Sequence, residues 1–235
     1  MNSLSLYDVL ATARRDRRPA LMVDVKCRSP RDGELISDEQ LEPYVRVLLD
    51  GGADALSTPT DPDFFGGSIP IARRIRRVAG VPLMRKEFFR TVDQMDESHE
   101  AGFDAVQISL STVPDPELFG AMKSRAEHLG LEVVVGVHNA EQLERAIELG
   151  AVAVGINNRD ITALELDDGT VSLSEKLIAD CPDDLLVISE SAFHSEADVS
   201  RAASAGAHCI LVGTAIAKSA DPAATVRSLR DAARA

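Results

Sequence analysis

Four similar phrases recur about every fifty residues along the chain, and this repeat is the strongest constraint on its fold. The phrases are "LDGGADALST" (49–58), "EAGFDAVQIS" (100–109), "ELGAVAVGIN" (148–157) and "SAGAHCILVG" (204–213). Each has the end of a helix, a glycine suited to the left-handed position that closes a helix, and then a short apolar strand. A spacing of this length is too long for one strand–helix unit and suits two.

Four further apolar runs supply the missing strands: "ALMVDVKC" (20–27), "VPLMRKEF" (81–88), "LEVVVGVH" (131–138) and "LLVISESA" (185–192). Eight strands alternating with eight helices predict an α/β chain with a parallel sheet covered by helices. Eight repeats favour closure into a (β/α)₈ TIM barrel, a single domain over residues 1–235 with a short amphipathic helix in 1–19. An open doubly wound sheet is the alternative, but no Gly-x-Gly-x-x-Gly turn follows the first strand.

The charge and the cysteines limit the partners and the location that we expect. A formal net charge of −13 argues against nucleic acid and against an anionic membrane surface as partners. No apolar run approaches the roughly 18 residues needed to span a bilayer. The three cysteines are scattered and the first residues are too polar for an export signal, which predicts a cytoplasmic protein. We expect no metal and no cofactor, and a monomer or a homodimer.

Polar residues stand at the carboxyl ends of the predicted strands, where a barrel of this kind places its chemistry. Asp24 and Lys26 end the first strand, Lys86 the third, Asn157 the sixth and Glu190 the seventh. Each residue taken singly is as compatible with a solvated position at the rim, or with a salt bridge, as with a catalytic role. Lysines and carboxylates that converge on one mouth can shift each other's pKa and serve as acid and base.

The last two strands predict a phosphate site. Ser191-Ala192 and Gly213-Thr214 each place small residues and a hydroxyl where a strand turns toward a helix. Backbone N–H groups at such turns bind a phosphate dianion, and barrels often use strands seven and eight for this purpose. Taken alone, each stretch is also compatible with an ordinary turn that binds no ligand.

Six motifs, in order, resemble the indole-3-glycerol phosphate synthase family of tryptophan biosynthesis: "DVKCRSPRDG", "STPTDPDFFGGS", "LMRKEFF", "GINNRD", "SESAF" and "LVGTAI". The resemblance extends from about Leu21 to about Ala217. It implies a phosphorylated small-molecule substrate and a carbon–carbon lyase. The reaction closes the ring of 1-(2-carboxyphenylamino)-1-deoxyribulose 5-phosphate and releases carbon dioxide and water.

The resemblance also implies roles for individual residues. Lys26 handles the substrate carboxylate and Lys86 is the general acid. The other implied site residues are Asn157, Arg159 and Glu190, which orient the substrate; Ser29, on the phosphate side; Phe65 and His138, in substrate binding; and Ser191, Ala192, Gly213 and Thr214, at the phosphate.

The chain departs from the family in four respects. Asp24 stands where the family has glutamate, so its carboxylate reaches about 1.5 Å less far. Ala192 replaces a glycine of the phosphate turn, and the family's longer N-terminal segment, which helps to cover the substrate, is largely missing. Gly136 stands where the family carries the catalytic glutamate of strand five. A replacement base is therefore needed, with His138, Asp24, Glu190 and water as candidates.

Three functional hypotheses follow. The first is the family's own lyase reaction, slowed by the missing glutamate. The second is a diverged enzyme for a related phosphorylated aryl substrate, with Gly136 making room for a different ring, or one that releases indole by retro-aldol cleavage. The third is a non-catalytic ligand-binding barrel, which would have no need of the retained lysines.

Overall fold

Eight parallel strands of the computed structural model close into a barrel, within the residues that the structure describes, 4–159 and 169–234. In order around the ring they are β1 (Ala20–Asp24), β4 (Ala55–Pro59), β5 (Leu83–Lys86), β6 (Ala105–Ser109), β7 (Glu132–Val137), β8 (Ala153–Asn157), β9 (Leu186–Glu190) and β10 (Cys209–Val212). Strand β10 pairs with β1, with Val212 opposite Val23, which closes the ring. The predicted (β/α)₈ barrel is confirmed, and the open sheet is excluded.

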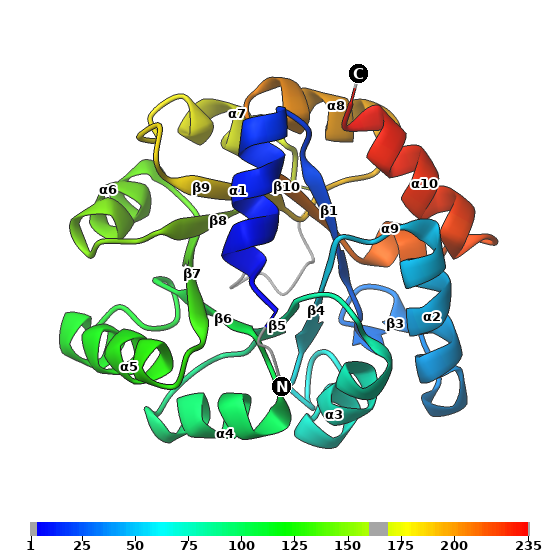
Figure 1. The fold of residues 1–235 in the computed structure, drawn as a ribbon, viewed down its shortest axis with the longest axis horizontal. Coiled ribbons are helices and arrows are strands. Elements are labelled where there is room, and N and C mark those ends of the chain that lie inside the picture. Colours follow the sequence, from blue (N-terminus) through cyan, green and yellow to red (C-terminus); the bar gives the residue numbers. More distant parts are fainter. Residues whose placement is uncertain (1–3, 160–168, 235) are drawn as a thin grey trace.

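The helices after the first strand surround the barrel (Figure 1). They are α2 (Leu41–Gly51), α3 (Ile69–Val78), α4 (Asp93–Ala101), α5 (Pro116–His128), α6 (Ala140–Glu148), α7 (Ser172–Ile178), α8 (Glu196–Ser204), α9 (Thr214–Ala217) and α10 (Pro222–Ala232). The glycines of the recurring phrase have φ values between 67° and 104°, so the predicted left-handed helix ends are confirmed. None of the described helices is long and apolar enough to cross a bilayer.

Helix α1 (Leu6–Asp16) lies across one end of the barrel (Figure 1). Its buried residues Leu6, Leu10 and Ala13 join the apolar cluster formed by the first inward residues of the strands. The Tyr7 hydroxyl donates a hydrogen bond of 2.7 Å to the carbonyl oxygen of Val133, early in β7. The helix therefore closes the amino-terminal end of the barrel, opposite the carboxyl ends of the strands, and does not cover the mouth.

The barrel interior changes from apolar to polar along the strands. On β1 the inward residue Met22 is followed two positions later by Asp24, and on β9 Ile188 is followed by Glu190. Because side chains alternate between the two faces of a strand, every second residue points inward. The amino-terminal half of the interior is thus packed with apolar side chains, and the carboxyl-terminal half holds charged ones.

A short hairpin that the sequence did not predict interrupts the connection between β1 and α2. Its strands are β2 (Arg28–Ser29) and β3 (Gly33–Glu34), followed by a 3₁₀ turn, η1 (Asp38–Gln40). The backbone N–H of Arg28 donates to the carbonyl oxygen of Phe65 at 3.0 Å, which ties the hairpin to the loop after β4.

Candidate active site

Lys86 and Glu190 form an ion pair inside the mouth of the barrel. Lys86 Nζ lies 2.7 Å from Glu190 Oε2, and Glu190 is 1% exposed. The second oxygen, Oε1, accepts a hydrogen bond from Gln107 Nε2 on β6. The carboxylate is therefore held by a cation and an amide donor, which compensates the cost of burying its charge.

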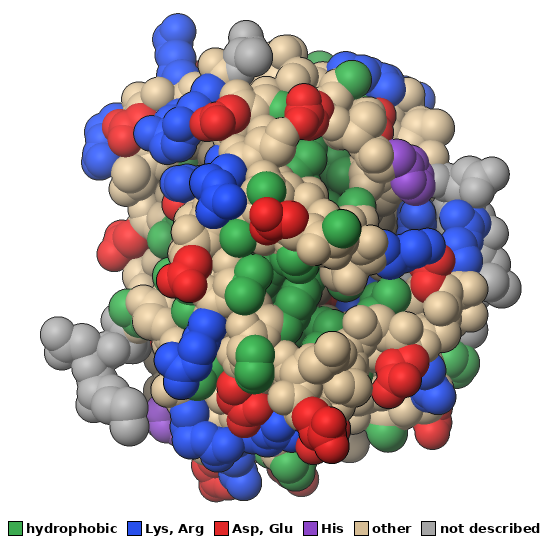
Figure 2. Space-filling model, turned by 90° about the vertical axis from the view of Figure 1, so that its right-hand side faces the viewer, with side chains coloured by type: hydrophobic (Ala, Val, Ile, Leu, Met, Phe, Trp, Pro, Cys, Tyr) green, Lys and Arg blue, Asp and Glu red, His purple; other side chains and the backbone are tan. Residues whose placement is uncertain are grey.

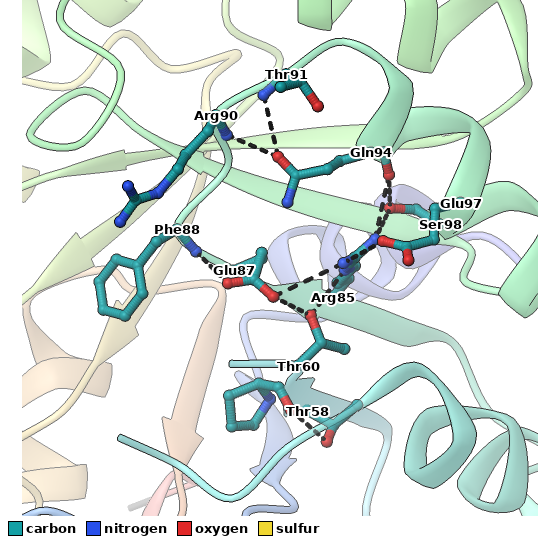
Figure 3. A network of polar contacts seen from close by, with 11 residues as sticks. Thr58, Thr60, Arg85, Glu87, Phe88, Arg90, Thr91, Gln94, Glu97 and Ser98 are labelled. Carbon is teal, nitrogen blue, oxygen red and sulfur yellow. Dashed lines mark hydrogen bonds and ion pairs between the residues drawn. The ribbon is translucent and has the colours of Figure 1, made fainter. Parts of the chain in front are cut away.

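Arg85 lies beside Lys86 in the sequence but points away from the barrel interior (Figure 3). Its guanidinium donates to Thr60 Oγ1 at 2.8 Å and to Ser98 Oγ at 2.9 Å, and forms an ion pair of 2.7 Å with Glu97. Figure 3 shows the same network joining Glu87 to Thr60. The network anchors the end of β5 to α4 and to the loop after β4, so it fixes the direction in which Lys86 points.

Asp24 and Lys26 extend from the end of β1 into the same mouth. Asp24 is 6% exposed, and its Oδ1 accepts a hydrogen bond of 2.6 Å from Ser57 Oγ. Lys26 Nζ lies 5.8 Å from the ring centroid of Phe65, within cation–π range. Phe65 in turn stacks on Phe88, with ring centroids 6.3 Å apart. The mouth therefore combines two lysines, two carboxylates and an aromatic wall.

A pocket of about 410 Å³ opens beside these residues. It is lined by residues of β1, β5, β10 and α9 and of the loops after β1, β8 and β9. Its charged side chains are Asp24, Lys26, Arg31, Asp32, Lys86, Arg159 and Lys218. Five of these are basic and two are acidic, in a protein of net charge −13. On the face formed around α2 and α10, by contrast, acidic and basic side chains are interspersed (Figure 2). The local excess of positive charge favours an anionic ligand in this pocket.

The two turns predicted to hold phosphate meet at the pocket. Ser191, Ala192, Gly213 and Thr214 all line it. Ser191 and Ala192 have φ values of 70° and 61°, a left-handed conformation that costs about 1–2 kcal/mol for residues other than glycine. The side chain of Asn158 donates to the carbonyl oxygens of Glu190 and Ser191 at 3.1 and 3.2 Å, which holds this strained turn in place. Ala192 thus keeps the left-handed backbone at an energetic cost.

Two other predicted residues, Ser29 and Asn157, face their own loops. Ser29 Oγ accepts from the backbone N–H groups of Arg31 and Asp32 at 3.3 and 3.4 Å. Asn157 Oδ1 accepts from the backbone N–H of Arg159 at 3.1 Å. Neither Ser29 nor Asn157 is among the described residues that line the pocket. Both therefore support the loops that carry the basic side chains.

His138 is held at the rim. Its Nδ1 lies 3.1 Å from Ser111 Oγ and 3.3 Å from Gln142 Oε1. Its backbone N–H donates to the same Gln142 oxygen at 2.9 Å. These contacts bind the imidazole to the loop after β6 and to α6, and His138 is not among the described residues lining the pocket.

Gly136 points into the barrel, as predicted from its shared face with His138, but the space beside it is not open. It lies in register with Ser109 on β6 and with Gly155 on β8. A Cβ at Gly136 would stand 3.2 Å from both Cα and Cβ of Ser109. Ser109 therefore crowds the position where a side chain at residue 136 would begin, and the hypothesis that Gly136 makes room for a different ring stays a prediction.

Gln107, Arg31 and Lys218 were not among the residues predicted from the sequence. Lys218 Nζ pairs with Asp32 Oδ1 at 2.5 Å across the pocket, joining the hairpin of β2 and β3 to the end of α9. Gln107 was detectable, since it occupies an inward position between Ala105 and Ser109 on β6. The approach of Arg31 and Lys218 depends on loop geometry and had no sequence signal.

The sequence matches the indole-3-glycerol phosphate synthase family over residues 1–229. The chain belongs to this family. An indole-3-glycerol phosphate synthase of Opitutus terrae is 36% identical over 226 residues, which cover 94% of this chain and 83% of the relative. The synthase of Thermococcus kodakarensis is 35% identical over 224 residues, covering 95% of this chain and 97% of the relative.

Solved structures with low sequence identity share the barrel. The N-acetylmannosamine-6-phosphate 2-epimerase of Clostridium perfringens superposes with a TM-score of 0.71 at 16% identity, covering 98% of this chain and 97% of the epimerase. A thiamine phosphate pyrophosphorylase of Pyrococcus furiosus gives a TM-score of 0.65, also at 16% identity, with 94% and 97% coverage. At this identity the likeness concerns the fold alone.

Proposed function

We propose that this member of the family is a carbon–carbon lyase that forms indole-3-glycerol phosphate from 1-(2-carboxyphenylamino)-1-deoxyribulose 5-phosphate. The observation that carries the proposal is the buried ion pair of Lys86 and Glu190 beside a basic pocket at the barrel mouth. A proton donor and a proton acceptor in contact suit a reaction that needs both. The family match over residues 1–229 supports the same conclusion.

The first chemical step needs a proton donor. The ring carbon that carries the carboxylate forms a bond to the ketone carbon, and the ketone oxygen takes a proton from the ammonium group of Lys86. Cleavage of the bond to the carboxylate then releases carbon dioxide and restores the aromatic ring. The basic charge of Lys26 compensates the substrate carboxylate until it leaves, while Phe65 provides a flat apolar surface for the ring.

The second step is a dehydration that needs a base. Solvent returns a proton to Lys86 after the first step. The new hydroxyl takes a proton from this ammonium group and leaves as water, and the adjacent methylene loses a proton, which forms the double bond of the indole. Glu190 is the carboxylate that we assign to this proton, because its contact with Lys86 allows the proton to return to the amine. Asp24 lies at the same mouth and is the second candidate.

The phosphate group of the substrate fits the turns at Ser191-Ala192 and Gly213-Thr214. Arg31, Arg159 and Lys218 line the same pocket as these turns. The Nε atom of Arg159 is buried without a hydrogen-bond partner among the described residues, so a bound anion would satisfy it. Charge-assisted hydrogen bonds from arginine are well suited to phosphate oxygens.

Indole fluorescence tests the proposal directly. Purified protein incubated with the carboxyphenylamino-deoxyribulose phosphate should produce an indole signal, and Lys86→Met should lower kcat by about 10²–10⁴. Lys123→Met is the matched control, because Lys123 pairs with Glu127 on the surface of α5 and should leave kcat unchanged. Absence of product at high enzyme concentration, or equal rates for wild type and Lys86→Met, would refute the proposal.

A related phosphorylated substrate with a differently substituted ring is the second candidate. Gly136 favours it, since the resemblance implies a glutamate there. Calorimetric titration with a series of ring-substituted analogues separates the two candidates, and tighter binding of the parental compound than of all analogues would exclude the second. The cytoplasmic location and the choice between monomer and homodimer stay predictions.

A further inference from the structure

Glu190 is held from two sides by inward residues of other strands. Lys86 Nζ lies 2.7 Å from its Oε2 atom, and Gln107 Nε2 donates a hydrogen bond to its Oε1 atom. Gln107 and Glu190 are 7% and 1% exposed, so water has little access to this contact. Each oxygen of the carboxylate thus has its own donor, and together the donors define the orientation of the group.

The hydrogen bond between Gln107 and Glu190 crosses the barrel interior over two strands. Strands β7 and β8 lie between β6, which carries Gln107, and β9, which carries Glu190. The contact passes over Gly155 of β8, where a Cβ would stand 2.5 Å from Glu190 Oε1 and would also collide with Gln107 Nε2. The contact therefore requires glycine at position 155.

The neighbouring strand has no side chain at the corresponding height. Gly136 of β7 is in register with Gly155. With glycine at both positions, no side chain from β7 or β8 lies between the amide of Gln107 and the carboxylate of Glu190.

We propose that Gln107 is a positioning residue, which holds Glu190 in the orientation that presents Oε2 to Lys86. The inference rests on the proposed function, in which Lys86 donates a proton and Glu190 accepts one. Misplacement of a catalytic group by about 1 Å can cost on the order of 10² in rate. Loss of a hydrogen bond to a charged group corresponds to a roughly 10- to 100-fold effect.

Two variants remove the contact from different sides. Gln107→Met keeps the length of the side chain and removes the donor, whereas Gly155→Ala keeps the donor and blocks its path. Both should lower kcat roughly 10- to 100-fold and change KM by less than about 3-fold. Gly120→Ala is the matched control for the glycine change, because no atom outside its own helix lies within 4 Å of a Cβ at Gly120. It should retain the wild-type kcat.

A pH profile separates positioning from simple packing. The carboxyl group introduced by Gln107→Glu can donate to Glu190 only while it is protonated, so kcat of this variant should fall steeply as the pH rises. The kcat of Gln107→Met should be low at every pH. Rescue of Gln107→Glu toward wild-type kcat at acidic pH would therefore support a role for the donated hydrogen bond, and the absence of any difference between the two profiles would contradict it.

Two further outcomes overturn the inference. Wild-type kcat in both Gln107→Met and Gly155→Ala would contradict it. A loss of unfolding free energy in Gln107→Met as large as its loss of transition-state stabilisation would also contradict it, because that pattern indicates a structural contact. If the wild-type protein forms no indole, the proposed function fails independently. In that case the contact is tested by the melting temperatures of Gln107→Met, Glu190→Gln and the double variant. A change in the double variant that differs from the sum of the two single changes supports the contact between the two side chains, and a change equal to that sum overturns it.

Discussion

Replacing Gly136 with glutamate should raise the rate of indole formation, because it introduces a carboxylate at the strand-five position where the resemblance implies a catalytic base. A positioned general base typically contributes about 10²–10⁴ in rate. We expect a gain near the lower end of this range, since Asp24 reaches about 1.5 Å less far than the glutamate that the resemblance implies at its position. Such a gain corresponds to roughly 2.7 kcal/mol of transition-state stabilisation.

The structure sets the stability cost of this change. The new Cβ would stand 3.2 Å from Cα and Cβ of Ser109, so β6 must move by a few tenths of an ångström. Overpacking of this kind costs about 1–3 kcal/mol, and replacing a glycine within a strand returns about 0.5–1 kcal/mol. The free energy of unfolding should therefore fall by about 0–2.5 kcal/mol, which a domain stable by about 5–15 kcal/mol tolerates.

Gly136→Ala is the matched control, because it carries the same Cβ and no carboxylate. Steady-state fluorescence assays of both variants, with thermal unfolding measured in parallel, isolate the effect of the carboxylate as the ratio of their kcat values. Equal kcat values in two folded variants would refute the reasoning. A gain shared by both would assign the improvement to packing against Ser109.

Three other perturbations have expected outcomes. Leu10→Ala should lower the free energy of unfolding by about 2–5 kcal/mol, since Leu10 is fully buried at the closed end of the barrel, and should leave KM unchanged below the melting temperature. Burial lowers the pKa of His208 below 6.5, and its Nδ1 accepts a backbone hydrogen bond of 2.9 Å, so the folded state favours the neutral ring. Its stabilisation is complete above pH 6.5 and is lost as the pH falls through the lowered pKa, so the melting temperature should drop less on acidification in His208→Asn than in wild type. Gly213→Ala should lower kcat/KM by about 10-fold or more, because the new Cβ would stand 3.0 Å from the Cβ of Asp24 and displace that residue. An unchanged kcat/KM would show that Asp24 can move without loss of activity.

Much of the site was predictable because side-chain alternation is a local property of a strand. Asp24, Lys86 and Glu190 end strands whose earlier inward residues are apolar, and a closed barrel brings all such ends to one mouth. The same logic placed Gly136 and His138 on one face. It did not show that the His138 ring turns toward α6, since that depends on Ser111 and Gln142 in other elements.

The sequence by itself determined the barrel, its inward-facing residues and the family, since a repeated strand–helix pattern and contiguous motifs are properties of neighbouring residues. Only the tertiary structure decided which end α1 closes and how closely Ser109 approaches Gly136. It also decided the contact between Gln107 and Glu190, which are separated by 83 positions in the chain. Contacts of this kind depend on how the strands are staggered around the ring, and no local pattern records that stagger.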